Sequence, residues 1–171
     1  TTETPFTPNT SRVLRNDRSS MPSSPTSARK ISCKVLQTIY RDQTFADDAF
    51  DAAIKNVVLS DSDRSLAFAI VYGVLRHSVT LDWRLDLLSR KPIARLPLNV
   101  ATVLKVAAYQ LLYLDRIPDS AAVNEAVKLI RKRPGHDWGG LVNGILRNLI
   151  RQPAPPLPHV SGDPVQGLSL Q

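Results

Sequence analysis

The sequence contains very few of the residues from which disulfide frameworks and metal centres are built. Its 171 residues include a single cysteine, Cys33, and three histidines that share no spacing typical of metal ligands. An internal disulfide is therefore excluded, and a reducing compartment is the expected setting. The carboxylates of Asp47, Asp48 and Asp51 lack a surrounding loop of oxygen ligands, so we expect them to form a solvated helix face. We expect no metal and no cofactor in this chain.

Sequence motifs of the common catalytic sites do not occur either. The seven glycines form neither a phosphate-binding loop nor a G-x-G-x-x-G pattern, and there is no H-E-x-x-H or C-x-x-C motif. Cys33 lies beside apolar positions of an expected helix, which favours a small buried side chain over a reactive thiol. No residue is predicted to be catalytic.

The longest apolar stretch, residues 100–114, is too short to cross a membrane. Spanning a bilayer takes about 20 apolar residues, and this stretch ends at Asp115. Lys105 is its one charged residue, and its apolar positions surround the expected helix almost completely. This pattern is typical of the central helix of a bundle. No membrane partner is expected.

Aromatic residues are scarce as well, at 6% of the chain. Trp83, Tyr109 and Tyr113 could stack on nucleobases, but aromatic residues flanked by leucines at helical spacing are more typical of a protein core. We therefore expect these three residues in the core.

Positive charge dominates what the sequence does contain, with 22 lysines and arginines against 15 acidic residues and a net charge of +7. This balance favours a polyanionic partner, with nucleic acid ahead of an anionic membrane. Arg29, Lys30 and Lys34 share one expected helix and are expected to point away from its apolar positions, where they could follow a phosphate backbone. Residues 131–133 form a second basic cluster, for which nucleic-acid binding and simple solvation both remain open.

Helical periodicity runs through residues 28–152, and no segment shows the sustained alternation of a strand. The predicted fold class is all-α, a compact bundle of about seven helices in one domain. Ser27 and Thr80 are expected to cap the first and fourth helices, and Asp61 or Ser62 the third. The expected helices are about 28–41, 45–58, 62–77, 81–90, 97–114, 120–133 and 139–151.

Some side-chain orientations also follow from the periodicity. Val57 and Val58 are expected to point inward from the end of the second helix. Asn124 and Asn143 lie among apolar residues of the last two helices, where a buried amide usually needs a hydrogen-bond partner. Gly144 weakens a helix unless it permits a close approach of another one. The last two helices are therefore expected to meet tightly.

Two tails are expected to flank the domain, namely residues 1–27, rich in Ser, Thr and Pro, and residues 153–171, rich in proline. Both compositions are typical of disordered segments or linkers. The three arginines of the first tail would suit an organelle transit peptide, whereas its two acidic residues argue against one. The cytoplasm is the expected location.

Seven short pieces of the sequence, taken in order, resemble a NusB-type domain. The pieces YGVLR, LDW and AYQLLYLDRIP are most similar to the NusB-like domain that precedes the catalytic part of ribosomal RNA cytosine-5 methyltransferases, the RsmB or Sun group. The VNEAV and VNGILR pieces are shared with the antitermination factor NusB. The seven pieces are SAR (27–29), DR (63–64) followed by VYGVLR (71–76), LDW (81–83), AYQLL (108–112), DRIP (115–118), AVNEAV (122–127) and LVNGILR (141–147).

The resemblance implies an all-helical domain that binds RNA, in NusB together with a small ribosomal protein, and whose basic first helix helps to hold the RNA. By position, the RNA-facing candidates are Arg29, Lys30 and Lys34. Arg76 and Arg147 match arginines of the family motifs and are added to the candidates. The sequence departs from the family at Asp119-Ser120, where we would expect His-Ala, and its first helix is less arginine-rich than that of NusB.

The expected function is RNA binding that positions ribosomal RNA for a cytosine-5 methyltransferase. The S-adenosylmethionine-binding domain and catalytic cysteines of that group do not occur in these residues, so methyl transfer is not expected from this chain alone. The first alternative is an antitermination factor of NusB type that acts with a ribosomal protein. A second alternative is a helical protein-interaction module that binds no RNA, in which the basic residues serve solubility.

Overall fold

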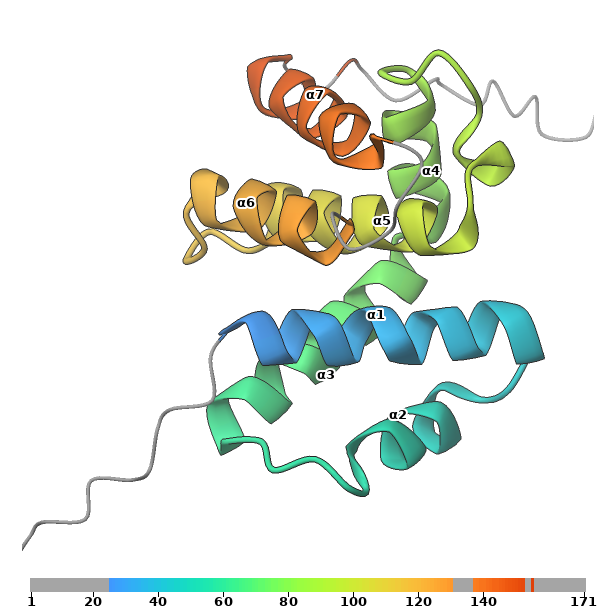
Figure 1. The fold of residues 1–171 in the computed structure, drawn as a ribbon, viewed down its shortest axis with the longest axis vertical. Helices are drawn as coiled ribbons and strands as arrows, with labels where there is room; N and C mark the ends of the chain where they lie inside the picture. Colours follow the sequence, from blue (N-terminus) through green and yellow to red (C-terminus); the bar gives the residue numbers. More distant parts are fainter. Residues whose placement is uncertain (1–24, 131–136, 153–154, 156–171) are drawn as a thin grey trace, which may run out of the picture.

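The computed structural model describes residues 25–130, 137–152 and 155, and every regular element within these ranges is helical (Figure 1). The predicted all-α fold class is confirmed, while the expected tails lie almost entirely outside the described residues. The elements are α1 (Pro25–Asp42), α2 (Ala46–Ile54), α3 (Asp61–Arg76), α4 (Ser78–Asp86), the 3-10 turn η1 (Ile93–Arg95), α5 (Leu98–Tyr113), α6 (Asp119–Ile130) and α7 (Trp138–Arg151).

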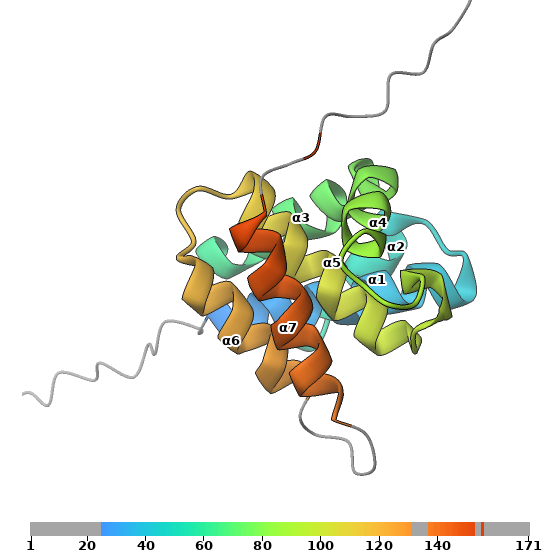
Figure 2. The same ribbon diagram turned by 90° about the horizontal axis from the view of Figure 1, so that it is seen from above.

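Helix α5 is the centre of the bundle, as its apolar sequence predicts. It contacts α1, α3, α4, α6 and α7. Helices α1 to α3 form one half of the molecule and α4 to α7 the other (Figure 1), and α6 and α7 lie side by side (Figure 2). Val100 and Leu104 are fully buried on α5. None of the described helices is both long and apolar enough to cross a bilayer.

Helix α1 begins three residues earlier than expected. It starts at Pro25, so Ser27 lies within the helix and does not cap it. A proline is well tolerated in the first turn, because the missing amide hydrogen would have no partner inside the helix there. Residues 25–27, which we expected in the first tail, therefore belong to α1.

Helix α2 is shorter than its apolar pattern indicates. It ends at Ile54, where the N–H group of Lys55 donates to the carbonyl of Asp51. The expectation that Val57 and Val58 point inward is wrong, since they are 40% and 97% exposed. The helical period does not govern the orientation of side chains beyond the end of the helix.

The expected caps of α3 and α4 are shifted. Ser60 caps α3 in place of Asp61 or Ser62, because its hydroxyl oxygen accepts from the Asp63 N–H group at 3.1 Å and donates to the Asp63 carboxylate at 3.0 Å. The amide group and the carboxylate of Asp63 thus both bond to the capping hydroxyl. Thr80 lies within α4, which begins at Ser78.

The contact between α6 and α7 does not depend on Gly144. A Cβ atom at Gly144 would meet nothing within 4 Å, so the predicted close approach at this glycine is wrong. Asn124 is exposed, and the half-buried Asn143 accepts a hydrogen bond from Arg147 of its own helix at 3.0 Å. A helix surface can be flanked by apolar residues in sequence and still face solvent, because neighbours in sequence lie about 100° apart around the axis.

Candidate nucleic-acid interface

The exposed edge of α1 carries Lys30 and Lys34, which lie one turn apart on the same side of the helix. Both side chains are exposed. Within the described part of the chain, neither ammonium group has a hydrogen-bond or ion-pair partner. Two unpaired positive charges on one helix edge can contact successive phosphates of a nucleic acid. We call Lys30 and Lys34 the α1 basic edge.

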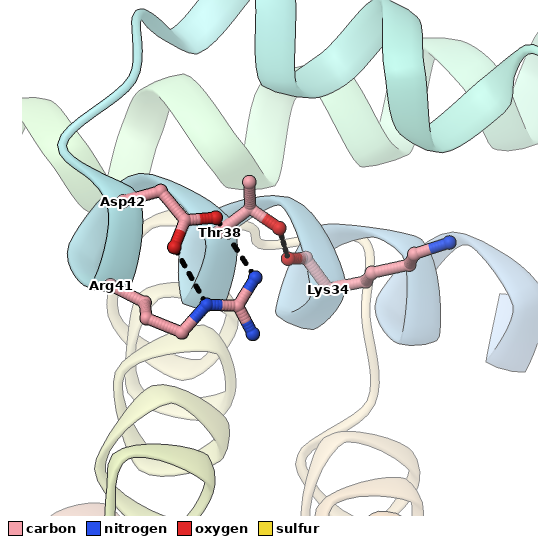
Figure 3. A network of polar contacts seen from close by, with 4 residues as sticks. All are labelled: Lys34, Thr38, Arg41 and Asp42. Carbon is pink, nitrogen blue, oxygen red and sulfur yellow. Dashed lines mark hydrogen bonds and ion pairs between the residues drawn. The ribbon is translucent and has the colours of Figure 1, made fainter.

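Near the end of the same helix, Arg41 and Asp42 form an ion pair in which their charges neutralise each other (Figure 3). Arg41 donates two hydrogen bonds to the Asp42 carboxylate, at 2.8 and 2.9 Å. This pairing raises the pKa of Arg41 and lowers the pKa of Asp42. The side chain of Lys34 extends away from the pair, and its backbone carbonyl accepts from the Thr38 hydroxyl at 3.1 Å. The two unpaired lysines of this edge therefore both precede the Arg41–Asp42 pair along α1.

Arg29 lies on a different side of α1, and the expectation that it points to solvent is wrong. Its side chain is only 4% exposed, and its Nε–H group donates to Oε1 of Gln110 on α5 at 2.5 Å. Gln110 in turn donates to the carbonyl of Val106 at 2.8 Å. Burial lowers the pKa of the Arg29 guanidinium, and the nearby Glu125 carboxylate raises it. Arg29 therefore joins α1 to the central helix.

Of the other predicted residues, Arg147 lies on a helix that does not contact α1. Arg76 is exposed at the end of α3, and Arg147 is exposed on α7, where it donates to Asn143. Helix α7 contacts neither α1 nor α3. The second basic cluster, residues 131–133, lies outside the described residues. Of the five candidates, the structure thus places Lys30 and Lys34 together and exposed.

Two features of the surface were missed at the level of sequence. Asn124 and Asn143 line one groove between α6 and α7, together with Lys128 and Asp137. Sequence spacing does not indicate that the two asparagines face the same groove. Tyr113 was expected in the core and is 38% exposed.

The order of the helices and the sequence motifs they carry match a known family. The NusB family model matches residues 26–151. This chain belongs to the NusB family.

Relatives of the NusB domain are named in two ways. The chain is 37% identical over 125 residues to a probable ribosomal RNA small subunit methyltransferase B of Synechocystis, a match that covers 73% of this chain and 28% of that protein. It is 30% identical over 137 residues to the transcription antitermination protein NusB of Ruminiclostridium cellulolyticum, covering 75% of this chain and 89% of that one.

Solved NusB structures confirm the fold. The NusB structure of T. maritima superposes with a TM-score of 0.72 at 21% sequence identity, covering 79% of this chain and 96% of that one. A NusB chain crystallised with NusE and double-stranded RNA superposes with a TM-score of 0.68 at 19% identity, covering 74% and 95%. The chain spans less than a third of the length of the methyltransferase relatives that it matches. The NusB domain is thus common to both named groups.

Proposed function

We propose that this chain is an RNA-binding domain that positions ribosomal RNA for cytosine-5 methylation, with the catalytic residues lying outside residues 1–171. The observation that carries the RNA-binding part is the α1 basic edge, where Lys30 and Lys34 are exposed and unpaired within the described residues. The similarity to methyltransferase B proteins, at 37% identity, supports the assignment to ribosomal RNA.

The binding mechanism is electrostatic. Each lysine that contacts a phosphate releases condensed counterions, so affinity falls as salt rises. Contacts to phosphates orient a nucleic acid but carry no sequence information. Lys30 and Lys34 would therefore hold the RNA backbone along α1, while the choice of sequence would come from elsewhere in the protein.

Two variants of equal charge test the electrostatic part. The double variant Lys30→Ala/Lys34→Ala is compared with Lys55→Ala/Lys91→Ala, which removes two other exposed lysines. Binding of a labelled small-subunit ribosomal RNA fragment is measured by fluorescence anisotropy across a salt series. We expect the first variant to lower the slope of log affinity against log salt by about 1.4, the value for two single-strand phosphate contacts, and the second to leave it unchanged. Equal slopes for the two variants would contradict the proposal.

A second candidate function is antitermination together with a ribosomal protein. It is supported by the similarity to NusB proteins, of which this chain covers 89% in one case, and by the NusB structure solved with NusE and RNA. Purification of the tagged chain from cells separates the two functions. Recovery of ribosomal precursor particles favours methylation, whereas recovery of transcription elongation complexes favours antitermination. Failure to bind RNA at low salt would leave only a protein-interaction module.

A further inference from the structure

Aromatic side chains gather on one face of the bundle, where α3 meets the end of α5. Phe68 stacks on Tyr72 with ring centroids 4.2 Å apart. Tyr113 stacks on His77 at 4.2 Å and on Tyr109 at 5.3 Å, with the rings within 24° of parallel. We call these five residues the aromatic shelf. It holds four of the chain's ten Phe, Tyr and Trp residues.

Part of the aromatic shelf is open to solvent. Phe68 is 49% exposed and Tyr113 is 38% exposed, so each of the two stacked groups has one ring that is partly open to solvent. Four of the five shelf residues, all but Tyr113, line a surface cavity of about 400 Å³ together with Ala69, Gly73 and Arg76. Exposed apolar residues that gather in one patch, unlike scattered ones, often mark an interaction site.

Charge decides which kind of partner fits. Among the described residues that line the cavity, Arg76 is formally charged and none is a carboxylate. Arg76 is exposed and has no hydrogen-bond or ion-pair partner in the described part of the chain. Two carboxylates, Asp47 and Asp51, lie near Tyr72 outside the cavity lining, and Asp47 accepts a hydrogen bond from the Tyr72 hydroxyl. Aromatic rings beside a free guanidinium suit a ligand that combines a flat apolar surface with an anion.

We propose that the aromatic shelf binds unpaired nucleobases of single-stranded RNA, with Arg76 contacting an adjacent phosphate. This inference rests on the proposed RNA-binding function and adds a second contact to it. Nucleobases stack on exposed aromatic rings in a manner that tolerates any sequence. The α1 basic edge would then hold backbone, while the shelf would select strands whose bases are free to unstack.

The test separates bases from phosphates. The probes are a labelled ten-nucleotide oligouridine and an abasic oligomer of the same length and charge. Phe68→Ala and Tyr113→Ala are compared with Phe45→Ala, which removes an aromatic side chain that is 81% exposed and has no ring contact among the described residues. We expect each shelf variant to weaken oligouridine binding by about tenfold, within the range for one lost stacking contact. Binding of the abasic oligomer, the salt slope and the Phe45→Ala affinity should stay unchanged.

A measurement on the unsubstituted chain guards against variants that fail to fold. The ring resonances of Tyr113 and Phe68 in NMR spectra should shift on addition of oligouridine and stay in place with the abasic oligomer. If the unsubstituted chain binds both oligomers equally, or if a ribosomal protein and not oligouridine shifts these resonances, the shelf does not bind bases. If neither oligomer binds at low salt, the proposed function itself fails. The two failures are therefore distinguishable.

Discussion

Arg29 of α1 donates a hydrogen bond to Gln110 of α5 at 2.5 Å, and both side chains are almost completely buried. The two residues are 81 positions apart in the sequence. Arg29 is predicted from the sequence to face RNA, but in the structure it is buried and joins α1 to α5. A buried amide oxygen that loses its donor retains the cost of its desolvation, so this pair should contribute to the stability of the bundle.

Replacing Arg29 should therefore affect folding. We expect Arg29→Ala to lower the free energy of unfolding by about 1–3 kcal/mol, because Gln110 loses its buried partner. Urea denaturation followed by circular dichroism measures the change. The neighbouring Lys30→Ala, an exposed position, should change it by less than about 0.5 kcal/mol. Replacing both partners, as in Arg29→Met with Gln110→Met, should recover much of the loss. An unchanged unfolding midpoint for Arg29→Ala would show that the hydrogen bond does not stabilise the fold.

Replacing Gly73 and Gly144 with alanine should change the stability of the domain in opposite directions. A Cβ atom at Gly73 would overlap the ring of Tyr109, whereas one at Gly144 would meet open space. We expect Gly73→Ala to destabilise the domain by about 1–3 kcal/mol, as overpacking does. Gly144→Ala should stabilise it by about 0.5–1 kcal/mol, because alanine restricts the unfolded chain and favours a helix interior. Thermal unfolding of the two variants measures both effects, and a shift in the same direction would contradict the packing described for α3 and α5.

The single thiol should be unreactive in the folded chain. Burial raises the pKa of Cys33 to about 12 from its usual value near 9, so the nucleophilic thiolate is scarce at neutral pH. Iodoacetamide at pH 8 should leave the native chain unmodified and alkylate it in urea, as mass spectrometry can show. Rapid alkylation of the native chain would mean that Cys33 is accessible.

The same pKa shift predicts how stability depends on pH. The folded chain retains the Cys33 proton to a higher pH than the unfolded chain does. As pH rises, the thiol therefore ionises first in the unfolded chain, and this ionisation lowers the free energy of the unfolded state relative to the folded state. The free energy of unfolding should be unaffected by this group below pH 9 and should fall between about 9 and 12. Comparison with Cys33→Ala in urea titrations across this range isolates the contribution of the thiol.

Helix α1 illustrates how far the sequence predicts a site. Its periodicity placed Ile31, Val35 and Lys34 correctly, since each orientation follows from spacing within one helix. It misplaced Arg29, because α1 contacts α2, α3, α5 and α6. A helix covered on so many sides leaves only a narrow exposed edge, and the number of its neighbours is not encoded in its own period.

The aromatic residues of α5 likewise separate what sequence predicts from what helix packing decides. Tyr109 and Tyr113 lie in a stretch whose composition predicts a core helix, and the prediction is correct for most of α5. Tyr113 reaches solvent because α5 ends there, beside His77 at the end of α3. The relative position of two helix ends depends on how the helices pack, so it cannot be predicted from either helix alone.

The linear order of residues was sufficient for the all-α class, the central helix and the family, because each depends on spacing or motifs within short segments. The partner of Arg29, the crowding at Gly73 and the aromatic shelf depend on side chains that are distant in sequence. Their contacts arise only when the helices pack, since long-range proximity is set by the arrangement of the whole bundle and not by any local pattern. The exposed lysines of α1 depend on both sequence and tertiary structure. Helical periodicity predicts that they point outward, and the packing of the helices leaves them unpaired within the described residues.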